Sequence, residues 1–209
     1  MHTDFFHCER IAARRYAGQL SVDQIWAGRI QVAVEGIAMC VPRSEDMVLY
    51  TVAHALRHSY RRLSWFTDLC LLFDCDLDWE YLFATARSGR LERSLLYGLC
   101  FLQQYGALSP PLRSWAETRD MSAIETWLLQ RAFADRHSGE LGDILWSFNV
   151  RSALRRMQFL AQTYFPKPAV LLQVFPYLPK SLFPLAYGLR LGQLVFRGGR
   201  QLAGLVRKT

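Results

Sequence analysis

The chain has 209 residues, of which 51% are hydrophobic and 13% aromatic, so it holds enough apolar side chains for a sizeable core and lies outside the disordered range. It contains no run of about 18 uninterrupted apolar residues, which excludes an ordinary transmembrane helix. Its net charge of +7 is unevenly placed, because residues 144–209 carry ten Lys or Arg and no acidic residue, so that residues 1–143 sum to −3.

The cysteines and the first residues predict a cytoplasmic location. Five cysteines are dispersed without C-x-x-C spacing, and the N-terminal residues lack the basic-then-apolar order of a signal peptide. We therefore expect reduced thiols in the cytoplasm, with the basic last third available for peripheral attachment to the inner face of a membrane. No recognised nucleic-acid module accompanies the basic residues, so no specific nucleic acid is expected as a partner.

Residues 1–43 predict a small β element. Residues 3–9 are short and aromatic, which favours a strand, and residues 21–28 predict a short helix that Ser21 caps. Apolar residues then alternate from Ile30 to Val41 around Glu35-Gly36, which predicts a β-hairpin with its turn near Gly36.

Residues 44–164 predict a multi-helix domain, so the fold is expected to be mainly α. The first helix begins at Ser44, as its cap, with Glu45 and Asp46 in the first turn. Apolar spacing predicts the later helices, and Gly89 and the Ser109-Pro110-Pro111 breaker end two of them. The later helices are expected over residues 63–73, 79–88, 91–105, 122–133 and 144–164.

Residues 165–209 predict a Pro-interrupted, basic, amphipathic tail. Five prolines divide residues 165–184 into short pieces, and the following segment interleaves apolar residues with basic ones. On a helix, this segment could lie in a membrane interface or pack on the domain with its arginines at the edge, although five glycines weaken a free-standing helix. The candidate anion contacts are Arg190, Arg197, Arg200, Arg207 and Lys208.

His54 and His58 lie four residues apart, on one face of a helix, as paired metal ligands do. Asp68 could supply a third ligand, which would suit a metal-dependent hydrolase. The stretch lacks the glutamate of a zincin, and the arginines around it disfavour a dication, so we expect no metal and two histidines that pack between helices. The candidate pocket residues are His54, His58, Arg61, Trp65 and Asp68.

The segment Asp74-Cys75-Asp76-Leu77-Asp78 offers three alternating carboxylates. A calcium loop would need Gly and Glu where Trp79 and Thr85 stand, so we expect a polar loop in which Asp78 caps the next helix. Phosphate-binding P-loop, dinucleotide-binding and G-x-S-x-G motifs are absent from the sequence.

Several motifs together carry a family resemblance. They are Pro42-x-x-Glu45-Asp46, His54-x-x-x-His58, Leu63-Ser64-Trp65, Asp68 and Leu77-Asp78-Trp79, followed late in the chain by Ser152–Arg156 and Phe183–Arg190. In this order they resemble the bacterial family of uncharacterised nucleotidyltransferases. The resemblance implies a polymerase-beta-like transferase domain followed by a helical region, with Mg²⁺ and a nucleoside triphosphate where the family activity is retained.

The sequence departs from the family at the catalytic half. The Gly-Ser and the paired acidic residues have no counterpart, and Asp4 is the one catalytic candidate. Two-metal transfer needs several carboxylates, so we expect a truncated or degenerate form that serves as a helical accessory or substrate-pocket portion, without a cofactor of its own. A separate catalytic domain or polypeptide is then the expected partner. The alternative is a non-enzymatic helical adaptor that binds a partner or an anionic membrane surface.

Overall fold

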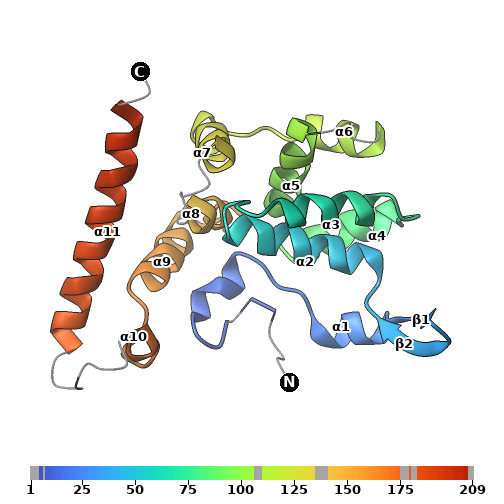
Figure 1. Ribbon diagram of the computed structural model, residues 1–209, viewed down its shortest axis with the longest axis horizontal. Helices are drawn as coiled ribbons and strands as arrows, with labels where there is room; N and C mark the ends of the chain where they lie inside the picture. Colours follow the sequence, from blue (N-terminus) through green and yellow to red (C-terminus); the bar gives the residue numbers. More distant parts are fainter. Residues whose placement is uncertain are drawn as a thin grey trace.

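The computed structural model describes residues 5–6, 8–105, 110–134, 141–174, 179 and 183–206, and it is mainly helical with one small hairpin (Figure 1). This confirms the fold class expected from the sequence. The first elements are η1 (Ala12–Tyr16), α1 (Val22–Ala27), β1 (Ile30–Val34), β2 (Ile37–Val41), α2 (Ser44–Arg57), α3 (Leu63–Phe73) and α4 (Trp79–Ser88). They are followed by α5 (Glu92–Tyr105), α6 (Pro110–Glu117), α7 (Ala123–Ala134), α8 (Leu141–Ser147), α9 (Ala153–Tyr164), α10 (Pro168–Val174) and α11 (Phe183–Val206).

Helix α2 is the centre of the core. It packs against α3, α4, α5 and α8, and its side chains Leu49, Val52 and Leu56 are completely buried. Gly98 lets α5 approach closely, because a Cβ at that position would lie 2.6 Å from Val52 Cγ1. The apolar stripe that predicted this helix therefore faces the core, with helices on several sides of it.

The β-hairpin has the predicted turn. Strands β1 and β2 pair antiparallel with Ile30 opposite Val41, and Glu35 (φ 52°) and Gly36 (φ 82°) form the turn between them. Positive φ at both central residues is the pattern of a tight hairpin turn, in which glycine is favoured at the second position. The Ser21 cap is also confirmed, because its hydroxyl accepts a hydrogen bond from Gln24 N at 3.2 Å.

The strand expected at residues 3–9 is wrong. Residues 5, 6 and 8–10 form turns, and in the described part of the chain β1 and β2 make up the one sheet. The aromatic side chains there pack in two directions, Phe5 on Tyr50 and Phe6 on Trp146, with ring centroids 5.6 Å apart in each pair. Aromatic content indicated burial correctly, but packing between helices rather than strand pairing provides it.

The first turns of α2 and α4 are joined by buried carboxylates. Glu45 Oε1 accepts a hydrogen bond from Asp78 N at 2.7 Å, and Asp46 Oδ1 accepts one from the Tyr81 hydroxyl at 3.1 Å. Asp78 caps α4 as predicted, because its Oδ1 accepts a hydrogen bond from Tyr81 N at 2.9 Å. Ser44 is not the cap of α2; it is the first helical residue, and its predecessor makes no side-chain cap.

Two elements differ from the expected helices. The helix expected over residues 144–164 is broken after Ser147, where tight backbone turns run to Val150 before Ser152 caps α9. The break leaves Asn149 buried against the start of α5, so tertiary hydrogen bonds override the helical pattern. Pro110, which was predicted to end a helix, is also the first residue of α6. Proline is tolerated at this position because the first N–H of a helix has no partner within the helix.

The C-terminal part contains two helices, α10 and the 24-residue α11. Figure 1 shows α11 at the edge of the molecule, beyond α9 and α10. Its start is anchored, because Ala186 is buried and the Tyr187 hydroxyl donates a hydrogen bond to Pro166 O at 2.7 Å. No described helix combines the length and apolar character needed to cross a bilayer. The division at residues 43/44 and 164/165 stays a prediction.

Candidate functional site

The end of α2 places two histidines beside a sharp reversal of the chain. His54 and His58 lie one turn apart on the same face of the helix, and Ser59 and Tyr60 then both adopt φ of 52°, in the left-handed region. Tyr60 N donates to Ala55 O at 2.9 Å, which closes the helix and turns the chain back. Helix α3 therefore packs along α2 and returns Trp65 to the two histidines.

Burial of Tyr60 holds this reversal in place. Its side chain is 5% exposed and stacks on Phe101 with ring centroids 4.7 Å apart, while Phe133 meets it edge-on. Burial raises the pKa of the Tyr60 phenol well above its ordinary value. The neighbouring Ser59 Oγ accepts a hydrogen bond from Gly142 N at 2.9 Å, so α8 also supports the turn.

The histidine groove is the hollow that this reversal creates, with a volume of about 560 Å³. Its described lining consists of His54, His58, Arg61, Arg62 and Trp65. The His58 ring stacks on Trp65 with centroids 5.4 Å apart and an interplanar angle of 24°, and His54 meets Trp65 edge-on at 5.5 Å. Arg62 lies 5.8 Å from the Trp65 ring centroid, so cation and ring face the same hollow.

The electrostatics of the groove favour an anion over a metal ion. Burial, followed by the neighbouring charges of His54 and the surrounding arginines, lowers the pKa of His58 from 6.5 to about 4. His58 is therefore neutral at pH 7, while Arg61 and Arg62 remain charged at the exposed rim. Such a surface offers flat rings for stacking and two guanidinium groups for phosphate oxygens.

The structure unites four of the five candidate pocket residues. His54, His58, Arg61 and Trp65 line the groove, whereas Asp68 is exposed on α3 and lies outside the lining. Within the described ranges, no three His, Cys, Asp or Glu side chains converge as metal ligands would. The catalytic candidate Asp4 lies outside the described residues.

The candidate anion contacts of the tail are only partly described. Arg190 is half-buried on α11, while the side chains of Arg197 and Arg200 fall outside the described part. Arg207 and Lys208 also lie outside the described residues. Around Arg190, α11 exposes large apolar side chains, namely Leu185, Leu189, Leu191, Val195 and Phe196.

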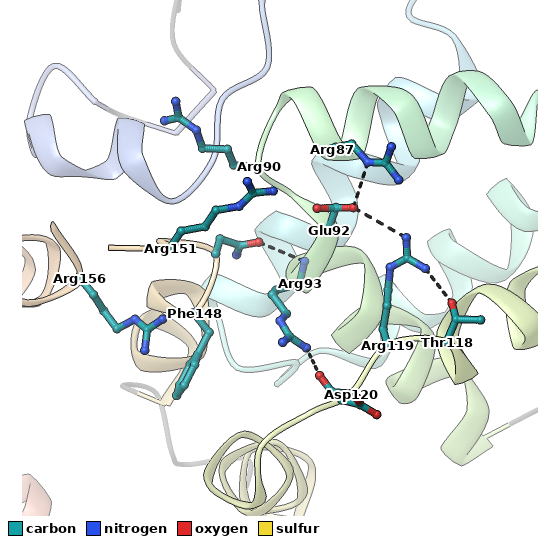
Figure 2. Close-up of a pocket in the computed structure, with 11 residues that line it drawn as sticks. Arg87, Arg90, Glu92, Arg93, Thr118, Arg119, Asp120, Phe148, Arg151 and Arg156 are labelled. Atoms are coloured by element: carbon teal, nitrogen blue, oxygen red, sulfur yellow. Dashed lines mark hydrogen bonds and ion pairs between the residues drawn. The ribbon is translucent and has the colours of Figure 1, made fainter. Parts of the chain in front are cut away.

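A second hollow, the arginine pocket, was not predicted from the sequence (Figure 2). It has a volume of about 730 Å³ and is formed where the end of α4, the start of α5, the segment after α6, the α8–α9 turn and the start of α9 meet. Its arginines are Arg87, Arg90, Arg93, Arg119, Arg151 and Arg156, and its other lining residues are Glu92, Thr118, Asp120, Phe148 and Asn149. The one feature of the sequence that could have indicated this pocket is the recurrence of arginine every three residues at Arg87, Arg90 and Arg93.

Comparison with known proteins gives one match. Residues 6–106, nearly half of the chain, match the model of a family of uncharacterised nucleotidyltransferases. No curated protein and no solved structure matches the chain. The matched segment contains the whole histidine groove and three arginines of the arginine pocket. The chain is therefore similar to nucleotidyltransferases over this segment, which agrees with the motifs between Pro42 and Trp79, while the motifs at residues 152–156 and 183–190 lie outside the match.

Proposed function

We propose that the chain supplies the substrate-binding helices of a nucleotidyltransferase-like protein, with the histidine groove as the place where the nucleotide binds. The observation that carries this proposal is that the groove combines Trp65 and two histidine rings with two exposed arginines inside the segment similar to the family. Aromatic and imidazole rings suit a nucleobase, and guanidinium groups suit its phosphates.

The chain contributes to binding rather than to the transfer step itself. Phosphoryl-type transfer through two metal ions needs several carboxylates close together, and the sequence lacks the Gly-Ser and paired acidic motif that provides them in the family. A separate catalytic domain or polypeptide supplies these groups and Mg²⁺. In this arrangement the neutral His58 positions the ligand and the arginines neutralise its charge.

Incubation of the purified chain with Mg²⁺ and labelled nucleoside triphosphates tests the accessory role, and we expect no transfer of label to the protein or to added acceptors. Calorimetry tests nucleotide binding, and we expect the chain to bind the nucleotide. Robust transfer by the purified chain alone would contradict the accessory role. Absence of nucleotide binding, at low salt and with or without Mg²⁺, would contradict the assignment of the groove.

A second candidate function is that of an adaptor at an anionic membrane surface, which the exposed side of α11 favours. Val195 is 67% exposed and Phe196 is 65% exposed, in a part of the chain without any acidic residue. Apolar side chains beside arginines suit the interface of anionic lipids. Co-sedimentation with phosphatidylserine vesicles tests it. Binding should fall with salt and be lost in Val195→Glu/Phe196→Glu, and equal binding by this variant would exclude α11 as the anchor.

A further inference from the structure

The arginine pocket gathers positive charge from parts of the chain that are far apart in sequence. Six arginines face it, against the two carboxylates of Glu92 and Asp120. Glu92 Oε1 lies 3.6 Å from Arg87 Nε and 3.7 Å from Arg119 Nη2, so one carboxylate is shared by two of the arginines. The lining therefore keeps a strong excess of positive charge, which a single residue does not neutralise.

Several of these arginines are held in fixed positions. The Arg119 guanidinium lies 3.7 Å from the Trp115 ring centroid, and its Nη1 donates hydrogen bonds to Trp115 O and Thr118 Oγ1, each at 3.0 Å. Arg93 Nη1 donates to Asp120 O at 2.6 Å, and its Nε lies 3.4 Å from Glu125 Oε1. Side chains that are already ordered lose little entropy when a ligand binds.

Glu125 is the buried support beneath Arg93. Burial opposes its ionisation, but hydrogen bonds from Tyr97 and Ser122, together with the charge of Arg93, lower its pKa overall. The Tyr97 hydroxyl donates to Glu125 Oε1 at 2.5 Å. The carboxylate is therefore charged at neutral pH and holds Arg93 at its Nε, while Figure 2 shows the end of the guanidinium directed at Asp120 on the pocket wall.

Arg151 and Arg156 have donors without an acceptor among the described residues. Arg151 is exposed and makes no hydrogen bond or ion pair with any residue that the structure describes. Arg156 stacks at 4.8 Å from the Phe148 ring centroid and donates from Nη2 to Val150 O, yet its buried Nε has no described partner. A guanidinium group has five N–H donors, so the exposed Arg151 side chain in particular keeps its donors available to a ligand.

The backbone at the start of α5 does not provide the binding groups. Asn149 Oδ1 accepts hydrogen bonds from Arg93 N at 3.2 Å and Ser94 N at 3.4 Å, so these two amides are occupied by the protein itself. The positively charged groups that line the pocket are therefore guanidinium groups. Several guanidinium groups around one hollow match the oxygens of phosphate groups, since each can donate two parallel hydrogen bonds.

We infer that the arginine pocket binds the phosphate groups of a small phosphorylated molecule. The volume of about 730 Å³ accommodates a ligand of that size. The excess of arginine favours a ligand with several negative charges, such as a diphosphate or a sugar phosphate, over a monocarboxylate. This binding site is separate from the histidine groove, and ligand binding there requires no part of the function proposed above.

Calorimetric titration with inorganic pyrophosphate at low salt, without metal ions, tests this inference. The wild-type protein should bind, and binding should weaken as salt rises. Arg151→Glu should weaken it about tenfold or more, because a charge-assisted donor is replaced by a repelling carboxylate. Arg113→Glu is the matched control, since Arg113 is exposed on α6, outside the pocket lining, and the change in net charge is the same.

A second variant, Arg90→Gln/Arg151→Gln, removes charge without introducing a carboxylate and should also weaken binding, while circular dichroism should match that of the wild-type protein. No binding of pyrophosphate by the wild-type protein would overturn the inference. An equal loss in Arg151→Glu and Arg113→Glu would also overturn it, since it would indicate attraction by net charge rather than a pocket. Unchanged binding in the double variant would exclude these arginines as ligand contacts.

Discussion

The histidine groove and the arginine pocket differ in how their residues are distributed along the sequence. The groove is formed within residues 54–65 by one helix, a sharp turn and the start of the next helix. The arginine pocket is assembled from side chains between Arg87 and Arg156, on five segments. Local spacing therefore predicts the first site, whereas only the folded chain brings the second together.

The two sites also differ in how their charge relates to the sequence. The positive net charge of the chain comes from residues 144–209, whereas residues 1–143 have a net charge of −3. Four arginines of the pocket nevertheless belong to residues 1–143. Acidic residues elsewhere in that part, such as Glu45 and Asp46, are buried at a helix contact and do not face the pocket. Regional net charge therefore misses a strongly basic local surface.

The largest effect is expected where α8 crosses the end of α2, because this contact supports both sites. A Cβ on Gly142 would lie 2.0 Å from Leu56 O and 3.0 Å from Arg57 O. Gly142→Ala should lower the free energy of unfolding by about 3 kcal/mol, because two backbones must separate. Gly188→Ala, on α11 with open space around it, is the control.

Urea unfolding measures both variants. Gly188→Ala should leave stability the same or raise it by about 1 kcal/mol, because alanine favours the helix. A loss below about 1 kcal/mol in Gly142→Ala would show that the two helices do not depend on this close approach. Ligand binding at both sites should weaken in the Gly142 variant, since Arg57 precedes His58 and α8 leads into the turn with Asn149.

Asn149→Ala should affect the arginine pocket, which Asn149 lines, and not the histidine groove. Asn149 is 7% exposed and bonds through its side chain to Arg93 N, Ser94 N, Ser94 Oγ and Trp146 O. Its removal leaves amides at the start of α5 without acceptors, so stability should fall by about 2 kcal/mol and pyrophosphate affinity should fall. Ser152→Ala, which removes the cap of α9, should lose about 1 kcal/mol with pyrophosphate affinity unchanged. Equal affinity in the two variants would contradict the role of Asn149 in shaping the pocket.

A smaller effect is expected in the pH dependence of stability. Because the pKa of His58 is about 4 in the folded protein and 6.5 in its ordinary state, the unfolded chain takes up this proton first as pH falls. The stability that depends on neutral His58 is therefore fully present above pH 6.5 and is lost as pH falls towards 4. Urea unfolding of wild-type protein and His58→Asn over this range should give a shallower decline in the variant. Parallel curves would show that His58 does not titrate as described.

The sequence predicted much of the fold because the strongest signals are local. The stripe Val48, Val52 and Leu56 predicted α2, and Asp78 and Gly36 marked a helix start and a hairpin turn correctly. The break at Asn149 was missed because its cause is a hydrogen bond to the start of α5, 56 residues away from Arg93 N. The strand at residues 3–9 was wrong because aromatic residues indicate burial without specifying what covers them.

The candidate site follows the same division. The helical spacing correctly predicted that His54 and His58 lie together. Trp65 joins them because the chain reverses at Ser59 and Tyr60, and the residue types at these positions did not predict that turn. Asp68 was included by its distance along the chain, and the helix instead directs it to solvent. The arginine pocket needs several tertiary contacts at once, and a single sequence does not reveal these.

The most direct test of the groove is the pKa of His58, measured by NMR from its ring resonances with and without a saturating nucleoside triphosphate analogue. A negative charge beside Arg61 and Arg62 would stabilise the imidazolium, so the pKa should rise from about 4 when the nucleotide binds. The rise should persist in Arg90→Gln/Arg151→Gln. In Arg61→Gln/Arg62→Gln the pKa should begin higher and no longer respond. A pKa that is unchanged in the wild-type protein at saturation would contradict nucleotide binding in the histidine groove.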